Sequence, residues 1–393
     1  MTPAARVQAA IEILDAVIEA ARTEGAPADR LVAAYFKTRR YAGSKDRRAV
    51  RELVYRAIRL CGEVPASGRA AMGALAAKDE AILQLFDGSN HGPAALDSGE
   101  AMAAPGIAPA WLVDRLEAAG IDAEEREAML GRAPLDVRVN TLKADRASLE
   151  LPEQGEALTA PQALRFPSGT QVEQWEAYRD GLIEVQDHGS QLVCLAAGAS
   201  PGETVIDLCA GAGGKTLGLA AQMENRGTLL ACDIDRNRLS RLSPRAERAG
   251  AGMIEPLLLN PGKEIEGLGL HAGTADLVLV DAPCSGTGTW RRKPEAKWRL
   301  TPDRLKRFAA TQDHLLGIAA RIVKPGGRIC FVTCSLLDEE GKDRIDAFLL
   351  HNPGWTALPA AIPIGRSHGQ GTRLTPSHDG TDGFFVAMLG SPC

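Results

Sequence analysis

The chain has 393 residues, is 45% hydrophobic and 24% charged, and carries a net charge of −5. These values are typical of a globular protein with an ample core, and the absence of any run of 18 apolar residues argues against a transmembrane helix. Eight cysteines without a CxxC pair argue against a disulfide framework or a zinc site, and Met1–Ala21 lacks the pattern of a signal peptide, so we expect a cytoplasmic protein with free thiols.

The first 88 residues read as helices. Apolar residues recur at three- and four-residue steps in two stretches, beginning at Val7 and at Val50. Residues 87–109 are crowded with Gly, Pro, Ser and Asn and resemble a linker, and further helices are expected at Ala110–Ala119 and Asp122–Gly131. We therefore predict an all-α domain over residues 1–88 and a helical linker over residues 89–135.

The pattern changes to a strand near Val137, which begins a small α/β subdomain over residues 136–200. From residue 201 to residue 393 strands alternate with longer helices, which is the pattern of a doubly wound, mostly parallel sheet. The strands of this domain are expected at Thr204–Cys209, Thr228–Asp233, Glu255–Leu259, Ala275–Asp281 and Arg328–Cys334. A final strand pair is expected around Trp355–Leu358 and Gly383–Leu389.

A glycine-rich turn follows the first of these strands and leads into a helix. Its residues are Cys209, Ala210, Gly211, Ala212, Gly213, Gly214 and Lys215. Glycine lets the backbone of such a turn approach a ligand closely, and an acid at the end of the next strand, here Asp233, is expected to hold a ribose through its hydroxyls.

Three ligands compete for this turn. A P-loop would need glycine where Cys209 stands, and a dinucleotide loop would need glycine where Thr216 stands. S-adenosylmethionine needs less phosphate binding and more small residues, so the turn favours this cofactor over a nucleoside triphosphate.

Two cysteines follow predicted parallel strands. Cys284 lies in the run DAPCSGTG that begins at Asp281, and Cys334 lies in the run TCS. The carboxyl ends of parallel strands line the ligand crevice of a doubly wound sheet. Two thiols at this edge suggest covalent chemistry, whereas Cys194, Cys232 and Cys330 are interpreted as small core residues.

Basic residues cluster in two places despite the negative net charge. Between Lys37 and Arg59 there are nine basic residues and two acidic ones, and between Arg291 and Arg307 there are eight and two. Solvated helix faces would explain either cluster alone, but the pair favours a nucleic acid as partner. For Lys297-Trp298-Arg299, contact with an RNA backbone and a role as core anchor remain open alternatives, and Trp290 is equally open.

The turn at Asp207–Thr216, the run Asp281–Gly288 and the triplet Thr333–Ser335 together resemble the RNA cytosine-5 methyltransferases. The similarity covers roughly residues 130–390 and is greatest to the bacterial branch of the Sun or RsmB type, which is related to the eukaryotic NSUN proteins and methylates small-subunit rRNA. The stretch Asp46–Tyr55 resembles the NusB-like RNA-binding domain of that branch. The resemblance implies a Rossmann-like class I methyltransferase domain with a seven-stranded sheet, preceded by a NusB-like domain and a small RNA-binding subdomain.

The resemblance also implies roles for residues. Cys334 would attack C6 of cytosine, Cys284 would assist proton removal and product release, and Asp281 would hydrogen-bond the base and approach the cofactor. The family has an acid near the adenine where this chain has Asn260, and a proline where it has Ala212.

Alternatives follow for the nucleophile and for the function. DNA cytosine methyltransferases use a Pro-Cys cysteine, which would correspond to Cys284, and Lys215 or the Arg291–Arg299 segment could activate the thiol. The expected protein is a monomer that binds RNA and S-adenosylmethionine and needs neither a metal nor a membrane. A non-catalytic RNA-binding assembly factor is the alternative function, although binding alone would need neither thiol.

Overall fold

The structure is a computed structural model that describes residues 1–393, and it divides into two compact units. The first unit comprises Met1–Gly131 and Thr289–Thr301, and the second comprises Arg132–Gly288 and Pro302–Cys393. The chain therefore returns to the first unit for the thirteen residues Thr289–Thr301. The last domain was instead expected to run without interruption from residue 201 to residue 393. None of the helices combines the length and the hydropathy that a membrane span requires.

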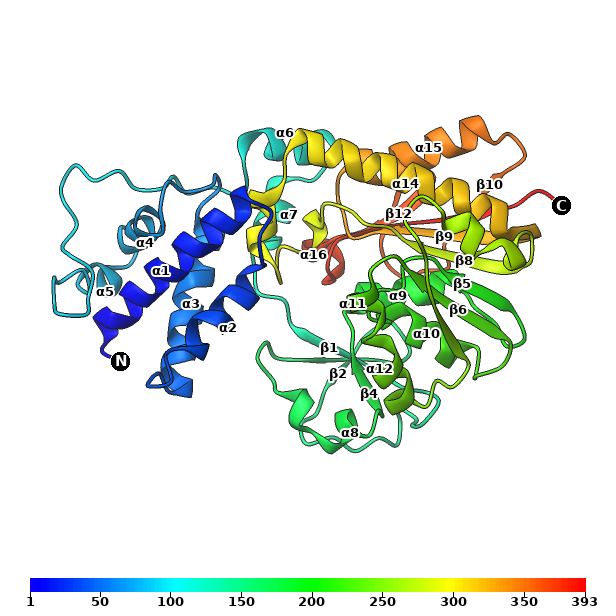
Figure 1. The fold of residues 1–393 in the computed structure, drawn as a ribbon, viewed down its shortest axis with the longest axis horizontal. Helices are drawn as coiled ribbons and strands as arrows, with labels where there is room; N and C mark the ends of the chain where they lie inside the picture. The colour runs from blue at the N-terminus through cyan, green and yellow to red at the C-terminus, as the bar shows by residue number, and fades with distance from the viewer. The chain divides into compact units, whose positions relative to one another are not determined.

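The first unit is all helical (Figure 1). Its helices are α1 (Pro3–Arg22), α2 (Ala28–Lys37), α3 (Ser44–Leu60), α4 (Gly68–Ala76), α5 (Glu80–Leu83), α6 (Ala110–Ala118), α7 (Ala123–Ala128) and the 3-10 helix η4 (Pro294–Arg299). The periodic residues Val7 and Val50 are fully buried in one core shared by α1 to α4. Gly68 lies against the backbone of α1, where a Cβ would clash with the Ile11 carbonyl oxygen.

The η4 segment is built into this helical core. Trp298 is buried, and its indole Nε1 donates to the carbonyl oxygens of Cys61 and Gly62 at 3.3 and 3.2 Å. The Nζ of Lys297 is equally enclosed and donates to the Ile107 carbonyl oxygen at 2.8 Å. Trp298 is thus a core anchor, and contact of Lys297 and Trp298 with an RNA backbone is excluded by their burial.

The second unit begins with a small antiparallel sheet in the order β2-β3-β1-β4. Its strands are β1 (Leu135–Val139), β2 (Glu156–Ala157), β3 (Ala163–Phe166) and β4 (Ile183–Val185), with η1 (Val172–Gln174) and α8 (Glu176–Arg179) in the connection between β3 and β4. Phe166 and Trp175 pack edge to face at 5.1 Å and, with Val137, form its separate core.

A nine-stranded mixed sheet forms the rest of this unit, in the order β11-β12-β13-β9-β8-β5-β6-β7 with β10 beside β13. The strands are β5 (Thr204–Asp207), β6 (Thr228–Asp233), β7 (Ile254–Leu258), β8 (Ala275–Asp281), β9 (Val323–Thr333), β10 (Thr356–Leu358), β11 (Arg366–His368), β12 (Gly371–Leu374) and β13 (Phe384–Gly390). Strands β5 to β9 are parallel, and β10 to β13 join antiparallel. The expected count of seven is therefore wrong, because the polar hairpin β11–β12 extends the sheet.

Helices cover both faces of this sheet (Figure 1). The helices of the unit are α9 (His188–Ala197), α10 (Gly214–Gln222), α11 (Arg236–Leu239), α12 (Leu242–Ala249), α13 (Glu264–Gly267), α14 (Pro302–Ile322), α15 (Lys342–His351) and α16 (Pro376–Asp379). Successive β8 residues face opposite sides, so Leu277 packs with α9 and α10 whereas Val278 packs with α14 and α15. Burial on both faces explains why these strands read as continuous apolar runs.

Candidate active site

Two half-buried thiols meet at the carboxyl edge of the large sheet. Strands β8 and β9 are parallel neighbours, with Asp281 opposite Val332, so the loops that follow them leave the sheet side by side. The Sγ atoms of Cys284 and Cys334 are 3.4 Å apart, and neither cysteine forms a disulfide. The topology therefore brings together the two cysteines that the sequence singled out.

A third segment closes this site from the side of β13. The Gly288 N–H donates to the Cys334 carbonyl oxygen at 3.0 Å, and the Gly383 N–H donates to the Gly288 carbonyl oxygen at 2.8 Å. Phe384 follows directly as the first residue of β13. Gly383 was expected only as the start of the final strand, and no role was expected for Phe384. Both lie in the TDGFF run that leads into β13.

An ion pair lies beside the thiols. The Nζ of Lys215, at the start of α10, donates to Oδ2 of Asp281 at 2.7 Å and lies 5.5 Å from the ring centroid of Phe384. Burial disfavours the charged Lys215, but the charge of Asp281 and its hydrogen bond outweigh burial and raise the pKa of Lys215. The charge of Cys334 adds to this rise.

The glycine-rich turn connects β5 to α10 as expected. Gly211 and Gly213 have positive φ angles of 56° and 85°, which glycine adopts without strain. A Cβ on Gly214 would meet no atom within 4 Å, so open space lies in front of this residue at the start of α10. A Cβ on Gly213 would instead clash with Leu242, so the open space lies at the Gly214 side of the turn.

The acidic residues around the turn differ in what they bind. Asp233 is buried and accepts the N–H groups of Gly211 at 2.8 Å and Asp235 at 2.7 Å. A carboxylate has further lone pairs for a ribose hydroxyl, so the expected role of Asp233 is compatible with these bonds. Asp207 is also buried, accepts from Thr216 Oγ1 at 2.7 Å, and has its pKa raised to about 7, mainly by burial.

The remaining residues expected around the cofactor lie at the same edge of the sheet. Asn260 follows β7 and is exposed, and Leu259 before it donates its N–H to the Asp233 carbonyl oxygen at 2.9 Å. Cys209 is half-buried, Ala210 is buried, and the Ala212 carbonyl oxygen accepts from Arg245. The fit to S-adenosylmethionine is thus supported by the open turn, the flanking acid and the exposed amide.

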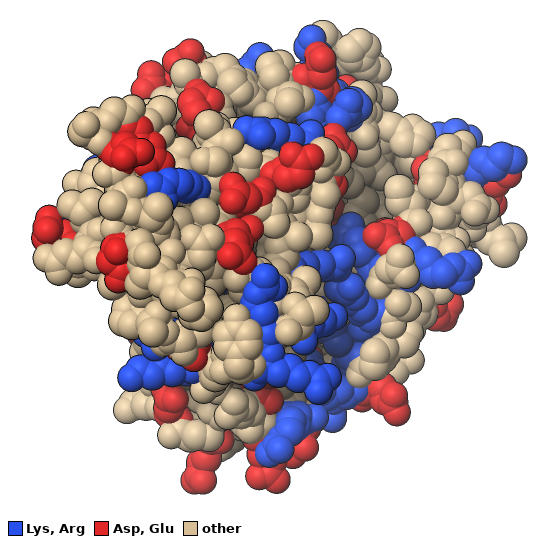
Figure 2. All heavy atoms as spheres, turned by 60° about the vertical axis from the view of Figure 1, so that its left-hand side comes forward, with Lys and Arg blue, Asp and Glu red and all other residues tan.

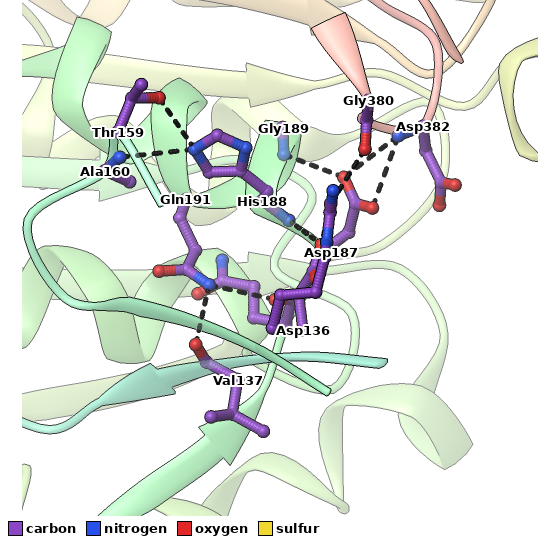
Figure 3. A network of polar contacts seen from close by, with 12 residues as sticks. Asp136, Val137, Thr159, Ala160, Asp187, His188, Gly189, Gln191, Gly380 and Asp382 are labelled. Atoms are coloured by element: carbon purple, nitrogen blue, oxygen red, sulfur yellow. Dashed lines mark hydrogen bonds and ion pairs between the residues drawn. The ribbon is translucent and has the colours of Figure 1, made fainter. Parts of the chain in front are cut away.

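A polar network connects the small sheet with the start of β13 (Figure 3). Arg165 donates to both carboxylate oxygens of Asp136, at 2.7 and 2.9 Å, and to the Gly380 carbonyl oxygen at 2.7 Å. Asp187, the N-cap of α9, accepts the N–H of Asp382 at 3.3 Å. These bonds fix the segment that leads into Gly383.

The same network buries a histidine, although the sequence analysis gave no histidine a role. The N–H of His188 donates to Asp136 at 3.0 Å, and its Nε2 lies 3.0 Å from Thr159 Oγ1 and accepts from the Ala160 N–H at 3.2 Å (Figure 3). Burial lowers the pKa of His188. A neutral ring that accepts at Nε2 is therefore a structural link.

Basic residues are exposed mainly on the helical unit. Six of the nine in the first cluster are exposed, namely Lys37, Arg40, Lys45, Arg47, Arg48 and Arg51. In the second cluster only Lys293, Lys306 and Arg307 are exposed, and its residues divide between the two units. The second cluster is therefore not one patch.

Figure 2, in which all Lys and Arg residues are blue, shows these residues gathered in one area of the face drawn there.

Comparisons with known proteins extend this picture. Residues 195–390 match a family described as 16S rRNA methyltransferase RsmB/F. A "probable ribosomal RNA small subunit methyltransferase B" of Bacillus subtilis is 31% identical over 297 residues, which cover 72% of this chain and 66% of that protein. A "ribosomal RNA small subunit methyltransferase B" of Sodalis glossinidius is 30% identical over 336 residues, which cover 81% of this chain and 74% of that protein. The crystal structure titled PH0851 aligns over 99% of both chains with a TM-score of 0.74 and 25% identity.

Proposed function

Because the chain belongs to the RsmB/F family of 16S rRNA methyltransferases, we propose that it methylates C5 of a cytosine in RNA, with small-subunit rRNA as substrate. The observation that carries this proposal is the 3.4 Å separation of the Cys284 and Cys334 sulfur atoms at the ends of adjacent parallel strands. A protein that only binds RNA would need no such pair of thiols.

The cofactor of the proposed reaction is S-adenosylmethionine, which when bound supplies the methyl group that an activated C5 takes. The turn from Cys209 to Lys215 would hold its methionine part, Asp233 its ribose and Asn260 its adenine. The open space at Gly214 and the spare lone pairs of Asp233 support this assignment.

Cytosine C5 is a poor nucleophile until a group adds to C6. In the proposed mechanism the Cys334 thiolate bonds to C6, and the electron pair of the C5–C6 double bond becomes available at C5. Asp281 accepts a hydrogen bond from the amino group of the base and, once N3 is protonated in the adduct, from N3–H, and Lys215 holds Asp281 in place. Cys284 then removes the proton from C5, the electrons of that C–H bond restore the double bond, and the C6–S bond breaks to return the Cys334 thiolate.

We further propose that the helical unit is a NusB-like RNA-binding domain. Its exposed basic residues on and around α3 support contact with a phosphate backbone, and the target base would have to be unstacked to reach the thiols.

The test uses labelled S-adenosylmethionine and RNA from cells that lack the protein. The wild-type protein should label this RNA at C5 of cytosine, whereas a non-catalytic assembly factor would label none. Cys284→Ala should accumulate a covalent protein–RNA adduct that resists denaturant, because release is blocked after the attack. Cys334→Ala should give neither adduct nor product, and the reverse pattern would reassign the nucleophile.

A further inference from the structure

A buried carboxylate lies behind the two cysteine loops. Glu340, the last residue of η5 (Asp338–Glu340), is fully buried. Burial raises its pKa, while hydrogen bonds from Ser285, Ser335 and Gln312 counteract that rise. An enclosed carboxylate is costly unless its oxygens are satisfied, so the groups that it binds show what it holds in place.

Its first partners flank Cys284. The Ser285 N–H donates to Oε1 of Glu340 at 2.7 Å, and the Ser285 hydroxyl donates to Oε2. Gln312 on α14 donates to the Pro283 carbonyl oxygen at 2.9 Å and lies 3.4 Å from Oε1 of the same carboxylate. The residues on both sides of Cys284 are thus fixed through one buried group.

Further bonds extend from this group to the loop of Cys334. Oγ of Ser285 lies 3.2 Å from Oγ of Ser335, which in turn lies 3.1 Å from Oγ1 of Thr287. The hydroxyl of Thr333 donates to the Glu340 carbonyl oxygen at 3.1 Å. Glu340 therefore connects the loop after β8 to the loop after β9, and these two loops set the distance between the sulfur atoms.

The charged groups around the thiol pair are arranged asymmetrically. Four causes raise the pKa of Cys284, namely its hydrogen bond with Cys334, burial, the charge of Cys334 and the charge of Glu340. Cys334 instead interacts with the Lys215 ammonium, which is itself paired with Asp281. A carboxylate opposes ionisation of a nearby thiol and an ammonium favours it.

We propose that Glu340 is a positioning residue that fixes the two cysteine loops against each other, and that its carboxylate, bound next to Cys284, makes Cys284 the thiol that acts second. This inference rests on the proposed covalent mechanism, because it explains how two adjacent thiols take different roles. Once Cys334 is bonded to carbon, it no longer carries a charge that opposes ionisation of Cys284. Cys284, which is only half-buried, can then lose its proton to solvent and as the thiolate accept the proton from C5.

The test measures alkylation of each thiol by limiting iodoacetamide across a pH series, with peptides resolved by mass spectrometry. In the wild-type protein Cys334 should react at a lower pH than Cys284. Glu340→Gln keeps the shape of the side chain and removes its charge, so Cys284 should react about tenfold faster at a given pH, which corresponds to one pH unit in its pKa. The exposed Asp346→Asn on α15 removes the same charge elsewhere and should change neither thiol.

Two results would overturn the proposal. One is a wild-type protein in which Cys284 reacts at the lower pH, and this measurement needs no variant to fold. The other is a folded Glu340→Gln protein whose Cys284 reacts as in the wild type. Because alkylation requires neither RNA nor a methyl donor, failure of this test is distinct from failure of the methylation assay.

Discussion

Lys297 carries an ammonium group that the helical unit encloses completely. Burial, with a smaller contribution from Arg59, lowers its pKa from 10.5 to about 7. Between these two values the unfolded chain binds more protons than the folded one, so the free energy of unfolding rises with pH across this window. Below about pH 7 the full cost of burying the charge remains.

We predict that Lys297→Met removes most of this pH dependence. The wild-type protein should gain up to about 1.4 kcal/mol of unfolding free energy per pH unit above neutrality from this group, and the variant should not. Denaturant unfolding at several pH values measures the difference. The exposed Lys293→Met serves as the control, and an unchanged slope in Lys297→Met would contradict the assignment.

Single residues were predictable where the sequence fixes their place along a strand. Cys284 and Cys334 follow strand ends, so their proximity is a consequence of strand order. Lys297 and Glu340 were not predictable in this way, because their burial depends on segments far away in the sequence. A lysine among arginines reads as a solvated charge, and Glu340 follows another glutamate in an ordinary polar loop.

At the scale of elements, the approach of the loop after β8 to the start of β13 depends on Gly288. A Cβ on this residue would clash with the backbone of Gly383. We predict that Gly288→Ala lowers the free energy of unfolding by about 1–3 kcal/mol. It should also reduce methylation, because the loop that carries Cys284 must move to relieve the clash.

The control for this prediction is Gly317→Ala on α14, where a Cβ would meet nothing within 4 Å. Alanine at this exposed position should stabilise the helix by about 0.5–1 kcal/mol. Thermal unfolding and the methylation assay compare the two variants. Equal stability in both would show that the close approach is not needed.

Strands β6 and β8 were predictable to within a few residues because they are buried on both faces. The expected Ala275–Asp281 agrees with β8, and Thr228–Asp233 agrees with β6. Strand β9 begins at Val323 rather than Arg328, since its first part runs through Pro325 and two glycines that read as a turn. The hairpin β11–β12 was missed because it is short, polar and half-exposed.

At the scale of the whole molecule, the net charge of −5 conceals a local excess of positive charge around α3. If these side chains bind phosphates, RNA binding should weaken as salt rises, with a slope proportional to the phosphates that they neutralise. We predict that replacing Lys45, Arg48 and Arg51 by Gln reduces the slope of log K against log salt by about 0.7 for each phosphate that is no longer bound.

Titration of RNA binding at several salt concentrations measures this slope. The double variant of Lys306→Gln and Arg307→Gln provides the comparison, since these exposed residues belong to the cluster that the fold divides. An equal decrease in slope for both variants would contradict a specific role for the surface around α3.

The division into units could not be read from the sequence, which suggested domains that follow one another along the chain. The polypeptide instead crosses between the units at residues 131/132, 288/289 and 301/302. The composition of residues 289–301 does not distinguish a surface loop from an inserted core segment, because the two tryptophans could bind a ligand at the surface or pack in a core.

This insertion has a consequence for how the gene could be shortened. A version that starts at residue 132 would lack the helices that shelter Trp298 and Lys297, yet it would still carry both, thirteen and more residues after Cys284. Without these helices, residues 289–301 would lose the core that buries them, and the exposed Trp298 beside the loop of Cys284 would promote aggregation. The amino-terminal helices could therefore not be removed in one deletion without also changing residues 289–301, which follow the loop of Cys284.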